Sequence, residues 1–388
     1  MKSIYSIYKE RLIEISGKSR SLYCRAVTKK YTYDLGRIIG NDEEAFDDLM
    51  NFLWQGKKYS FNVISKDMKD KLYNTFNIEA RFKTALTQLD TLEGKEKNAY
   101  RLKIERAKKE ELAKSILAEV TSLTSLKREI EEFSKETGRY ELYIGYPFVT
   151  GALSKDLIVK APLLLFPCVI DVVDDTTVDI ELKQDENIQI NKVFMLAYAK
   201  EKRLNIDELD LDYANPLSST FKTIEDFLSA LRDAGIKFGG EIKKSFDSYD
   251  KLKEPRSGDA LEIQNACLIG RFPLANSIYN DYLELEKKRT LNEALNELII
   301  LKKPKLIKKF DENLYLINAL DYAQENTIYN INKDGNFVIY GPPGTGKSQT
   351  IVNIIADAIC KNKKILVVSQ KKAALDVVFN RLGILNNK

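Results

Sequence analysis

The chain has 388 residues, of which 44% are hydrophobic and 30% charged, and these proportions predict a soluble globular protein with two or three domains. Its 61 basic and 57 acidic side chains leave a formal net charge of +4, which is too small to predict nucleic-acid binding by itself. The sequence contains no histidine, which excludes Ser-His-Asp and Cys-His nucleophiles and histidine-based metal sites within this chain.

The cysteines and the apolar runs indicate the compartment. Cys24, Cys168, Cys267 and Cys360 lie far apart and match neither a zinc-finger spacing nor a disulfide framework, so a reducing cytoplasm is the simplest setting. The longest apolar run, residues 161–170, contains prolines and is too short to span a bilayer. We therefore expect a cytoplasmic protein with no membrane contact.

Residues 1–139 are predicted to form a helical region. From residue 95 to 133 the sequence is rich in Lys, Glu, Ala and Leu, and apolar residues recur at spacings of three and four. This pattern predicts one long amphipathic helix, or a pair of helices, that ends at Gly138.

Residues 140–300 are predicted to form a mixed α/β module. Residues 157–173 are dense in Val, Ile and Leu, and residues 177–182 alternate polar with apolar side chains, so both predict strands. The prolines in the first of these segments predict edge strands. Residues 187–199 and 223–234 predict helices that cover the sheet.

One arrangement in this module fits a nuclease. Asp171 or Asp174, followed by Glu181 and Lys183, matches the D…E-x-K pattern in which two carboxylates hold Mg²⁺ and a lysine assists phosphodiester hydrolysis. Such groups are also common on solvated hairpins, and the preceding helix offers no matching acid. A surface hairpin is therefore the preferred interpretation.

The third predicted domain spans residues 301–388 and begins with a basic run. Residues 301–310 contain five lysines. They fit a path for a phosphate backbone, since neutralised phosphates release counterions. A solvated helix or loop face explains the same run and is the preferred interpretation.

Residues 341–348, G-P-P-G-T-G-K-S, match the phosphate-binding loop G-x-x-x-x-G-K-[ST]. The apolar run 336–340 before the loop predicts a buried parallel strand, and the periodic apolar residues after it predict a helix that ends near Asn362. Residues 364–369 predict a second buried strand. Strand, loop, helix and strand together predict one right-handed crossover unit of a parallel sheet.

This loop predicts a site for ATP and Mg²⁺. Its glycines allow successive N–H groups to point at a polyphosphate, at the positive end of the helix dipole. Lys347 and Ser348 are the predicted catalytic groups, because the lysine supplies a cation to the β- and γ-phosphates and the serine hydroxyl binds Mg²⁺. The predicted cofactor-binding residues of the loop are Gly341, Pro342, Pro343, Gly344, Thr345, Gly346, Lys347, Ser348 and Gln349.

Hydrolysis requires more than the loop. A P-loop enzyme needs an acidic residue at the end of a neighbouring strand to hold the metal. After Lys347 the only acidic residues are Asp357 and Asp376, both inside predicted helices. We therefore expect the N-terminal part of a longer enzyme, without its Walker B motif and with poor hydrolysis on its own.

Two further segments resemble helicase motifs. Residues 367–382, V-V-S-Q-K-K-A-A-L-D-V-V-F-N-R-L, resemble motif Ia of superfamily 1 helicases. Residues 319–327, A-L-D-Y-A-Q-E-N-T, resemble the segment in which a glutamine reads the adenine edge. With G-P-P-G-T-G-K-S-Q-T between them, these motifs are similar to those of DNA helicases of the five-prime-to-three-prime branch.

The resemblance implies an α/β fold, namely an incomplete RecA-like P-loop domain with a parallel sheet, preceded by a helical stalk and a mixed α+β accessory module. The long helix is then the stalk, although a helical hairpin packed on its own domain fits nearly as well. The resemblance also implies that Gln324 recognises adenine. It assigns the contacts with single-stranded DNA, or alternatively RNA, to Ser369, Gln370, Lys371 and Lys372.

A less specific similarity extends upstream. Residues 140–167 and 267–285 resemble the region that precedes the motor in large bacterial helicases, some of which carry a nuclease domain beyond the motor. Residues 10–25 resemble the N-terminal signature of that family more loosely. The implied partners are therefore the C-terminal half of the motor and, in some members, a nuclease domain.

The sequence thus predicts the N-terminal part of an ATP-dependent superfamily 1 helicase or translocase that acts on single-stranded DNA. Two alternatives stay open at this point. The first is an AAA+ type ATPase that remodels proteins, which G-P-P-G-T-G-K favours and the motif Ia segment does not. The second is a non-catalytic interaction module from a truncated gene.

Overall fold

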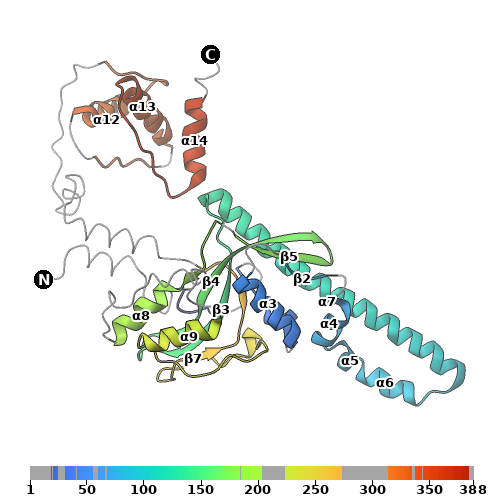
Figure 1. Cartoon of the computed structure of the whole chain (residues 1–388). Helices are drawn as coiled ribbons and strands as arrows, with labels where there is room; N and C mark the ends of the chain where they lie inside the picture. The colour runs from blue at the N-terminus through green and yellow to red at the C-terminus, as the bar shows by residue number, and fades with distance from the viewer. Residues whose placement is uncertain are drawn as a thin grey trace.

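The computed structural model describes residues 19, 21–24, 31–40, 42–55, 60–65, 68–183, 185–202, 223–272, 313–333, 337–342 and 344–383. Its elements form a larger part built around a β-sheet and a smaller, helical C-terminal part (Figure 1). None of the helices in these ranges is long and apolar enough to cross a membrane.

An antiparallel sheet organises the larger part. Its strand order is β1-β8-β3-β4-β5-β2, with β6 added to β4 and β7 added to β3. The longest pairing runs from Tyr143↔Pro167 to Ala152↔Ile158. The strands are β1 (Thr32–Asp34), β2 (Ser60–Ile64), β3 (Tyr143–Ala152), β4 (Ile158–Asp174), β5 (Thr177–Leu182), β6 (Gln189–Ile190), β7 (Glu262–Gln264) and β8 (Leu268–Gly270).

The sequence patterns for β4 and β5 are confirmed, but the edge position expected for β4 is wrong. Strand β4 pairs with β3 on one side and with β6 and β5 on the other. Pro162 pairs with Phe148 of β3, whereas the β6 partners of β4 begin only at Leu164. A proline is tolerated in this inner strand because it lies where β4 has a named strand on one side only.

Helix α7 (Gly94–Thr137) is 44 residues long, so the first of the two predicted arrangements, one long helix rather than a pair, is confirmed. It ends at Gly138, whose φ of 77° is left-handed and whose N–H donates to the Ser134 carbonyl. The C-terminal half packs on the sheet, and the N-terminal half projects away from it beside three shorter helices (Figure 1). These are α4 (Lys69–Thr75), α5 (Ile78–Arg81) and α6 (Lys83–Asp90).

A buried acid ties α7 to the sheet. Glu119 of α7 accepts hydrogen bonds from the Tyr33 hydroxyl at 2.7 Å and from the Arg37 guanidinium at 3.0 Å. Burial, followed by the charge of Glu119, raises the pKa of Tyr33 well above its ordinary value, so the phenol stays a donor. Tyr33 lies in β1 and Arg37 in α2 (Gly36–Ile39), so Glu119 connects α7 to both of these elements.

Helices α3 (Glu43–Gln55), α8 (Lys192–Lys202) and α9 (Ile224–Asp233) lie beside the sheet. The last two confirm the predicted helices. Asn191 is a buried residue directly before α8, and its Oδ1 accepts from Phe194 N at 3.1 Å. The Asn191 Nδ2 donates to Ser21 O at 2.7 Å and to Pro162 O at 2.9 Å, so this one side chain joins α8, β4 and the N-terminal segment.

We predict that Asn191→Ala lowers the free energy of unfolding by about 2–4 kcal/mol. The change removes a helix cap and leaves two buried carbonyls without their donor. Urea unfolding followed by circular dichroism measures the loss. The matched change Asn98→Ala, at an exposed asparagine of α7, is expected to alter stability by less than about 0.5 kcal/mol. Equal effects at the two sites would contradict the assignment.

The smaller part contains α12 (Tyr322–Lys333), α13 (Lys347–Cys360) and α14 (Lys372–Gly383). The predicted helix after the phosphate-binding loop is therefore confirmed. The small core of this C-terminal part is formed by Val352, Ile355 and Val378, with Ile317 and Leu382 packed against them.

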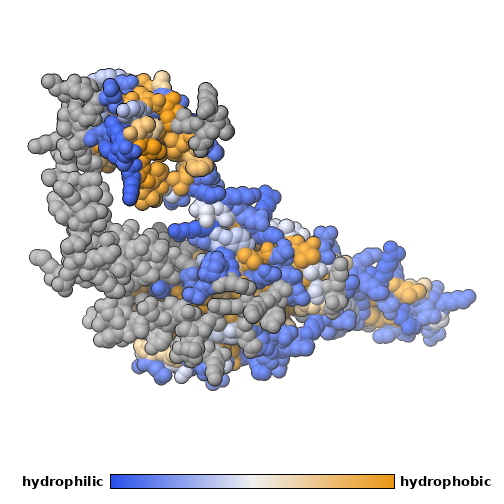
Figure 2. Space-filling model, turned by 45° about the horizontal axis from the view of Figure 1, so that its top comes forward, coloured by the Kyte–Doolittle hydropathy of each residue, from blue (hydrophilic) through white to orange (hydrophobic). Residues whose placement is uncertain are grey.

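The two strands predicted around α13 are not formed. Residues 337–340 and 363–369 have no strand, and their side chains are largely exposed, as for Tyr340 (91%) and Leu366 (87%). Figure 2 shows hydrophobic surface exposed on this part of the molecule. A parallel strand needs hydrogen-bonded neighbours and cover on both faces, and the described residues supply neither here. The sheet among the described residues is antiparallel, so the fold is mixed α/β, and the expected parallel RecA-like sheet is not formed within the described part of the chain.

Candidate functional site

The phosphate-binding loop leads directly into α13. Gly346 is the N-cap of this helix with a left-handed φ of 71°, and Gly344 has a φ of 85°. A Cβ added to Gly346 would lie 2.5 Å from the Nε2 atom of Gln324. The left-handed backbone conformation therefore favours glycine at position 346, and the missing side chain leaves room for the Gln324 amide.

Lys347 lies across the loop. Its Nζ donates to the carbonyls of Gly341 at 2.5 Å and Pro342 at 2.7 Å. The Thr345 hydroxyl donates to the same Pro342 carbonyl at 2.9 Å. The ammonium of Lys347 and the N-terminus of α13 thus combine their positive charge at one place, which is what binding of an anion requires.

Gln324 connects α12 to the loop. Its Nε2 donates to Thr345 O at 3.0 Å, and its Oε1 accepts from Asp321 N at 3.2 Å. In return, the Asp321 carboxylate accepts from Gln324 N at 2.8 Å, which makes a reciprocal cap at the start of α12. The structure therefore brings the sequence-predicted Gln324 to the loop.

Three polar side chains of α13, Gln349, Asn353 and Asp357, bind the segment before α12, and we call them the polar row. We call residues 315–319 the anchor segment. Asn353 is fully buried; its Oδ1 accepts from Ile317 N at 2.7 Å and Asn318 N at 3.1 Å, and its Nδ2 donates to Asn318 O at 3.1 Å. One turn earlier, the Gln349 side chain donates to Ala319 O. The anchor segment is therefore fixed along α13 by side-chain contacts to its backbone.

Asp357 completes this row one turn after Asn353. Its Oδ1 accepts from Tyr315 N at 3.0 Å, and its Oδ2 accepts from Asn332 Nδ2 at 2.6 Å and Lys361 Nζ at 2.9 Å. Burial raises the pKa of this carboxyl, but the hydrogen bonds and the Lys361 charge outweigh burial and hold the pKa below its ordinary value. Asp357 is thus ionised and structural.

The motif Ia residues lie at the start of α14. The Ser369 hydroxyl accepts from Lys371 N at 3.3 Å, and Gln370 is exposed. The Nζ of Lys371 lies 4.0 Å from Glu136 of α7, and that of Lys372 lies 3.9 Å from Asp376. The structure therefore gathers these four residues on one exposed corner, beside the C-terminal end of α7 (Figure 1).

Other predicted site residues are not brought together. Pro343 and the lysine run 301–310 lie outside the described residues. Ser348 is an exception, because it lies beside Lys347 in the first turn of α13. The D…E-x-K arrangement is not assembled: Asp171 pairs with Lys127 at 3.2 Å, and the Nζ of Lys183 is bound by Glu186 at 2.6 Å and Tyr140 O at 2.8 Å. No group of three or more acidic or cysteine side chains able to hold a metal occurs among the described residues.

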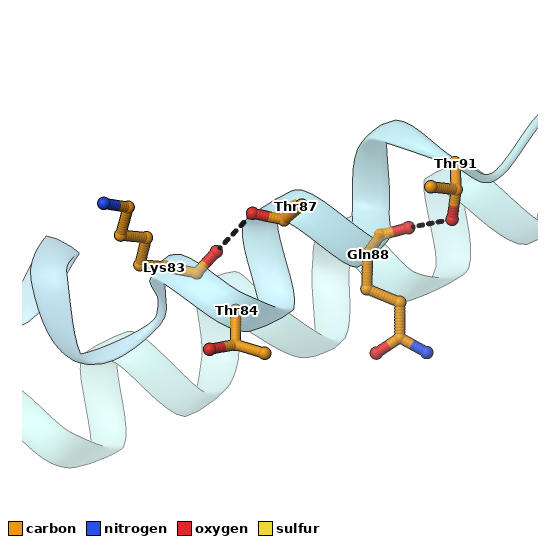
Figure 3. A pocket seen from close by; sticks show the side chains of 5 residues that line it. All are labelled: Lys83, Thr84, Thr87, Gln88 and Thr91. Atoms are coloured by element: carbon orange, nitrogen blue, oxygen red, sulfur yellow. Dashed lines mark hydrogen bonds between the residues drawn. The ribbon is translucent and has the colours of Figure 1, made fainter.

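A shallow depression on the surface of the described residues carries no chemistry of its own. It lies along α6 and is lined by Lys83, Thr84, Thr87, Gln88 and Thr91 (Figure 3). The hydroxyls of Thr87 and Thr91 turn back to the carbonyls of Lys83 at 3.1 Å and Gln88 at 2.7 Å. These groups are used by the helix itself, so the depression is not a candidate site.

Sequence reasoning missed the row on α13. It considered Asp357 only as an acid in the wrong place for a metal, and it gave Asn353 no role. The available signal was the recurrence of polar side chains at every fourth position, Gln349, Asn353 and Asp357, on a helix whose other buried positions are mostly apolar.

Two parts of the chain match protein families. Residues 319–388 match an AAA domain. Residues 11–195 match a family of proteins of unknown function, DUF4011. The first match begins at the end of the anchor segment and covers Gln324, the phosphate-binding loop and α14.

The chain is also similar to proteins named as helicases. It is 25% identical to the "Uncharacterized ATP-dependent helicase MG140" of Mycoplasma genitalium, over 97% of this chain and 31% of that protein. It is 27% identical to the MG140 homolog of Mycoplasma pneumoniae, over 68% of this chain and 24% of that protein. It is 33% identical to the "DNA polymerase alpha-associated DNA helicase A" of Schizosaccharomyces pombe, over 26% of this chain and 16% of that protein.

These similarities agree with the helicase motifs that the sequence contains. The AAA domain match includes the phosphate-binding loop, residues 341–348. The chain spans less than a third of the length of each of these three helicases. No solved structure matches it.

We predict that Asp357→Asn flattens the acid side of the stability profile. Because the folded-state pKa of Asp357 lies below the unfolded value, the ionised group stabilises the fold above the unfolded pKa, and this stabilisation is lost as the pH falls through the folded pKa. Urea unfolding between about pH 5 and pH 3 should therefore show a steeper loss for the unmodified chain than for the variant. Asp90→Asn, at an exposed carboxylate of α6, should keep the steeper profile; identical profiles for all three would contradict the assignment.

Proposed function

We propose that this chain is the N-terminal part of an ATP-dependent superfamily 1 DNA helicase of the five-prime-to-three-prime branch, and that it binds ATP with Mg²⁺. The observation that supports this most is the contact of Gln324 with the backbone of the loop, at Thr345 O. A glutamine that reads a base and a loop that holds phosphates must lie at one site, and these two segments do.

The side chains at the loop suit the triphosphate and the metal. The first turn of α13 offers backbone N–H groups without helical acceptors, and Lys347 adds a full positive charge beside them. The Ser348 hydroxyl in the same turn is a suitable oxygen ligand for Mg²⁺. Bound Mg²⁺ would neutralise charge on the β- and γ-phosphates, while the loop orients them.

The nucleic-acid side of the proposal rests on the exposed corner at Ser369, Gln370, Lys371 and Lys372. Lysines and hydroxyl or amide side chains are the usual partners of a phosphate backbone. The proposal assigns single-stranded DNA to this corner and residues 301–388 to the first part of the motor. The remaining motor, with the acid that completes hydrolysis, and any nuclease domain would come from further sequence, in line with the greater length of the related helicases.

We predict that Lys347→Ala weakens binding of a fluorescent ATP analogue with Mg²⁺ by at least about tenfold, because a charge-assisted contact to phosphate is worth about 1.5–3 kcal/mol. Fluorescence anisotropy of the whole chain measures this. Lys364→Ala is the matched control, because Lys364 is exposed and lies outside the loop. Equal binding by both variants, or no binding by the unmodified chain, would refute the nucleotide site.

We predict that the double change Lys371→Ala and Lys372→Ala weakens binding to a labelled oligothymidylate. The loss of two phosphate contacts should also reduce the slope of log affinity against log salt by about 1–2. Lys103→Ala with Lys109→Ala, two exposed lysines of α7, should leave affinity and slope unchanged. An oligouridylate in parallel compares RNA with DNA. Absence of binding to either would favour the protein-remodelling alternative.

A further inference from the structure

The polar row on α13 does more than fill space, because each of its side chains binds backbone atoms of one extended segment. Gln349, Asn353 and Asp357 contact the backbone at Ala319, at Ile317 with Asn318, and at Tyr315, respectively. Side-chain bonds to a non-helical backbone fix its position along the helix. The anchor segment therefore cannot slide without breaking several of these bonds.

Asn353 is the central member and has no access to water. A buried amide that loses its partner costs about 1–3 kcal/mol, so the Asn353 side chain needs its contacts with the backbone of Ile317 and Asn318. A carboxamide also offers what aspartate does not, since its Nδ2 can donate to Asn318 O while its Oδ1 accepts. Both directions of hydrogen bonding are used.

The anchor segment ends two residues before Asp321, the cap of α12. Gln324 lies in the first turn of that helix. Asp321 and Gln324 bind one another through both backbone and side-chain atoms, and only Leu320 separates Asp321 from the anchor segment. The Nε2 of Gln324 donates to Thr345 O, and Thr345 belongs to the loop that leads into α13. Asn353 and Gln324 thus belong to one continuous set of contacts. It runs from α13 to the anchor segment, along the chain to the cap of α12, and from Gln324 through the loop back to α13.

The contacts of Gln324 leave a donor and an acceptor for a base. A carboxamide has two N–H groups and two lone pairs on oxygen, and the described contacts use one N–H and one lone pair. Adenine presents an N–H donor at N6 beside the acceptor N7, whereas guanine presents two acceptors at O6 and N7. The remaining pair matches adenine and leaves guanine one acceptor without a donor.

We propose that Asn353 is a positioning residue for base selectivity, which acts through the anchor segment to hold the Gln324 carboxamide at the base end of the nucleotide site. This inference rests on the proposed function. It separates two tasks within one site: Lys347 and the loop hold phosphates, and the row on α13 sets the geometry that discriminates the base.

The test is competition against a fluorescent ATP analogue with Mg²⁺, using the whole chain and three competitors: ATP, GTP and inorganic tripolyphosphate. Asn353→Ala is expected to lower the preference for ATP over GTP by about three- to tenfold, the value of one mispositioned hydrogen bond. Affinity for tripolyphosphate, which has no base, should change by less than about twofold. Gln324→Ala removes the carboxamide itself, so it should show the lowest preference for ATP over GTP among these variants.

The matched control is Asn330→Ala. Asn330 is a buried asparagine of the neighbouring helix, and its amide donates to Asn326 within α12. This variant should keep the ATP preference of the unmodified chain. If Asn353→Ala keeps that preference too, or loses ATP, GTP and tripolyphosphate to the same extent, the positioning role is wrong. If the unmodified chain binds none of the competitors, the proposed nucleotide site itself fails and this inference fails with it.

A second pair of variants leaves α13 intact, in case Asn353→Ala does not fold. Asn318→Pro removes the backbone N–H that Asn353 accepts, whereas Asn318→Ala removes the same side chain and keeps that N–H. The proline variant should lose part of the ATP preference and the alanine variant should retain it. The same preference in both would overturn the proposal.

Discussion

The candidate site depends on one buried carboxamide. Asn353 lies in the small core of the C-terminal part, where each of its polar atoms must find a partner inside the protein. The backbone at Ile317 and Asn318 supplies those partners, so the burial of one helical residue fixes a segment far upstream. The position of Gln324 against the loop follows from that constraint, and with it the site as a whole.

Buried polar side chains also connect distant segments in the larger part. Glu119 binds Tyr33 and Arg37 beneath α7, and Asn191 binds the N-terminal segment and β4 at the start of α8. At its other end α7 meets α14, where Glu136 approaches Lys371 and the side chain of Lys372 passes Gly138. One continuous helix therefore connects the antiparallel sheet with the corner assigned to nucleic acid.

The sequence predicted the elements whose pattern is local and long. The apolar spacing of residues 95–133 and the glycine after it predicted α7 and its end, and the alternation in residues 177–182 predicted β5. Strands β1 and β2 were missed because they are short and pair with distant segments. The prediction of strands around α13 was wrong for a related reason. An apolar run shows that burial of its side chains is favourable, but not whether neighbouring strands are present to bury them.

The phosphate-binding loop was found because its motif fixes spacing and residue type together. The row on α13 was missed, because the recurrence of polar residues at every fourth position does not say which segment they bind.

Hydrogen–deuterium exchange of the whole chain, with and without ATP and Mg²⁺, tests the account most directly. If the anchor segment, Gln324 and the loop form one nucleotide site, the nucleotide will slow exchange in residues 315–324 and in residues 341–348 over the same concentration range, and leave α7 unchanged. Protection of the loop without any change in residues 315–324 would contradict a single site, and no protection in either segment would contradict nucleotide binding by this chain.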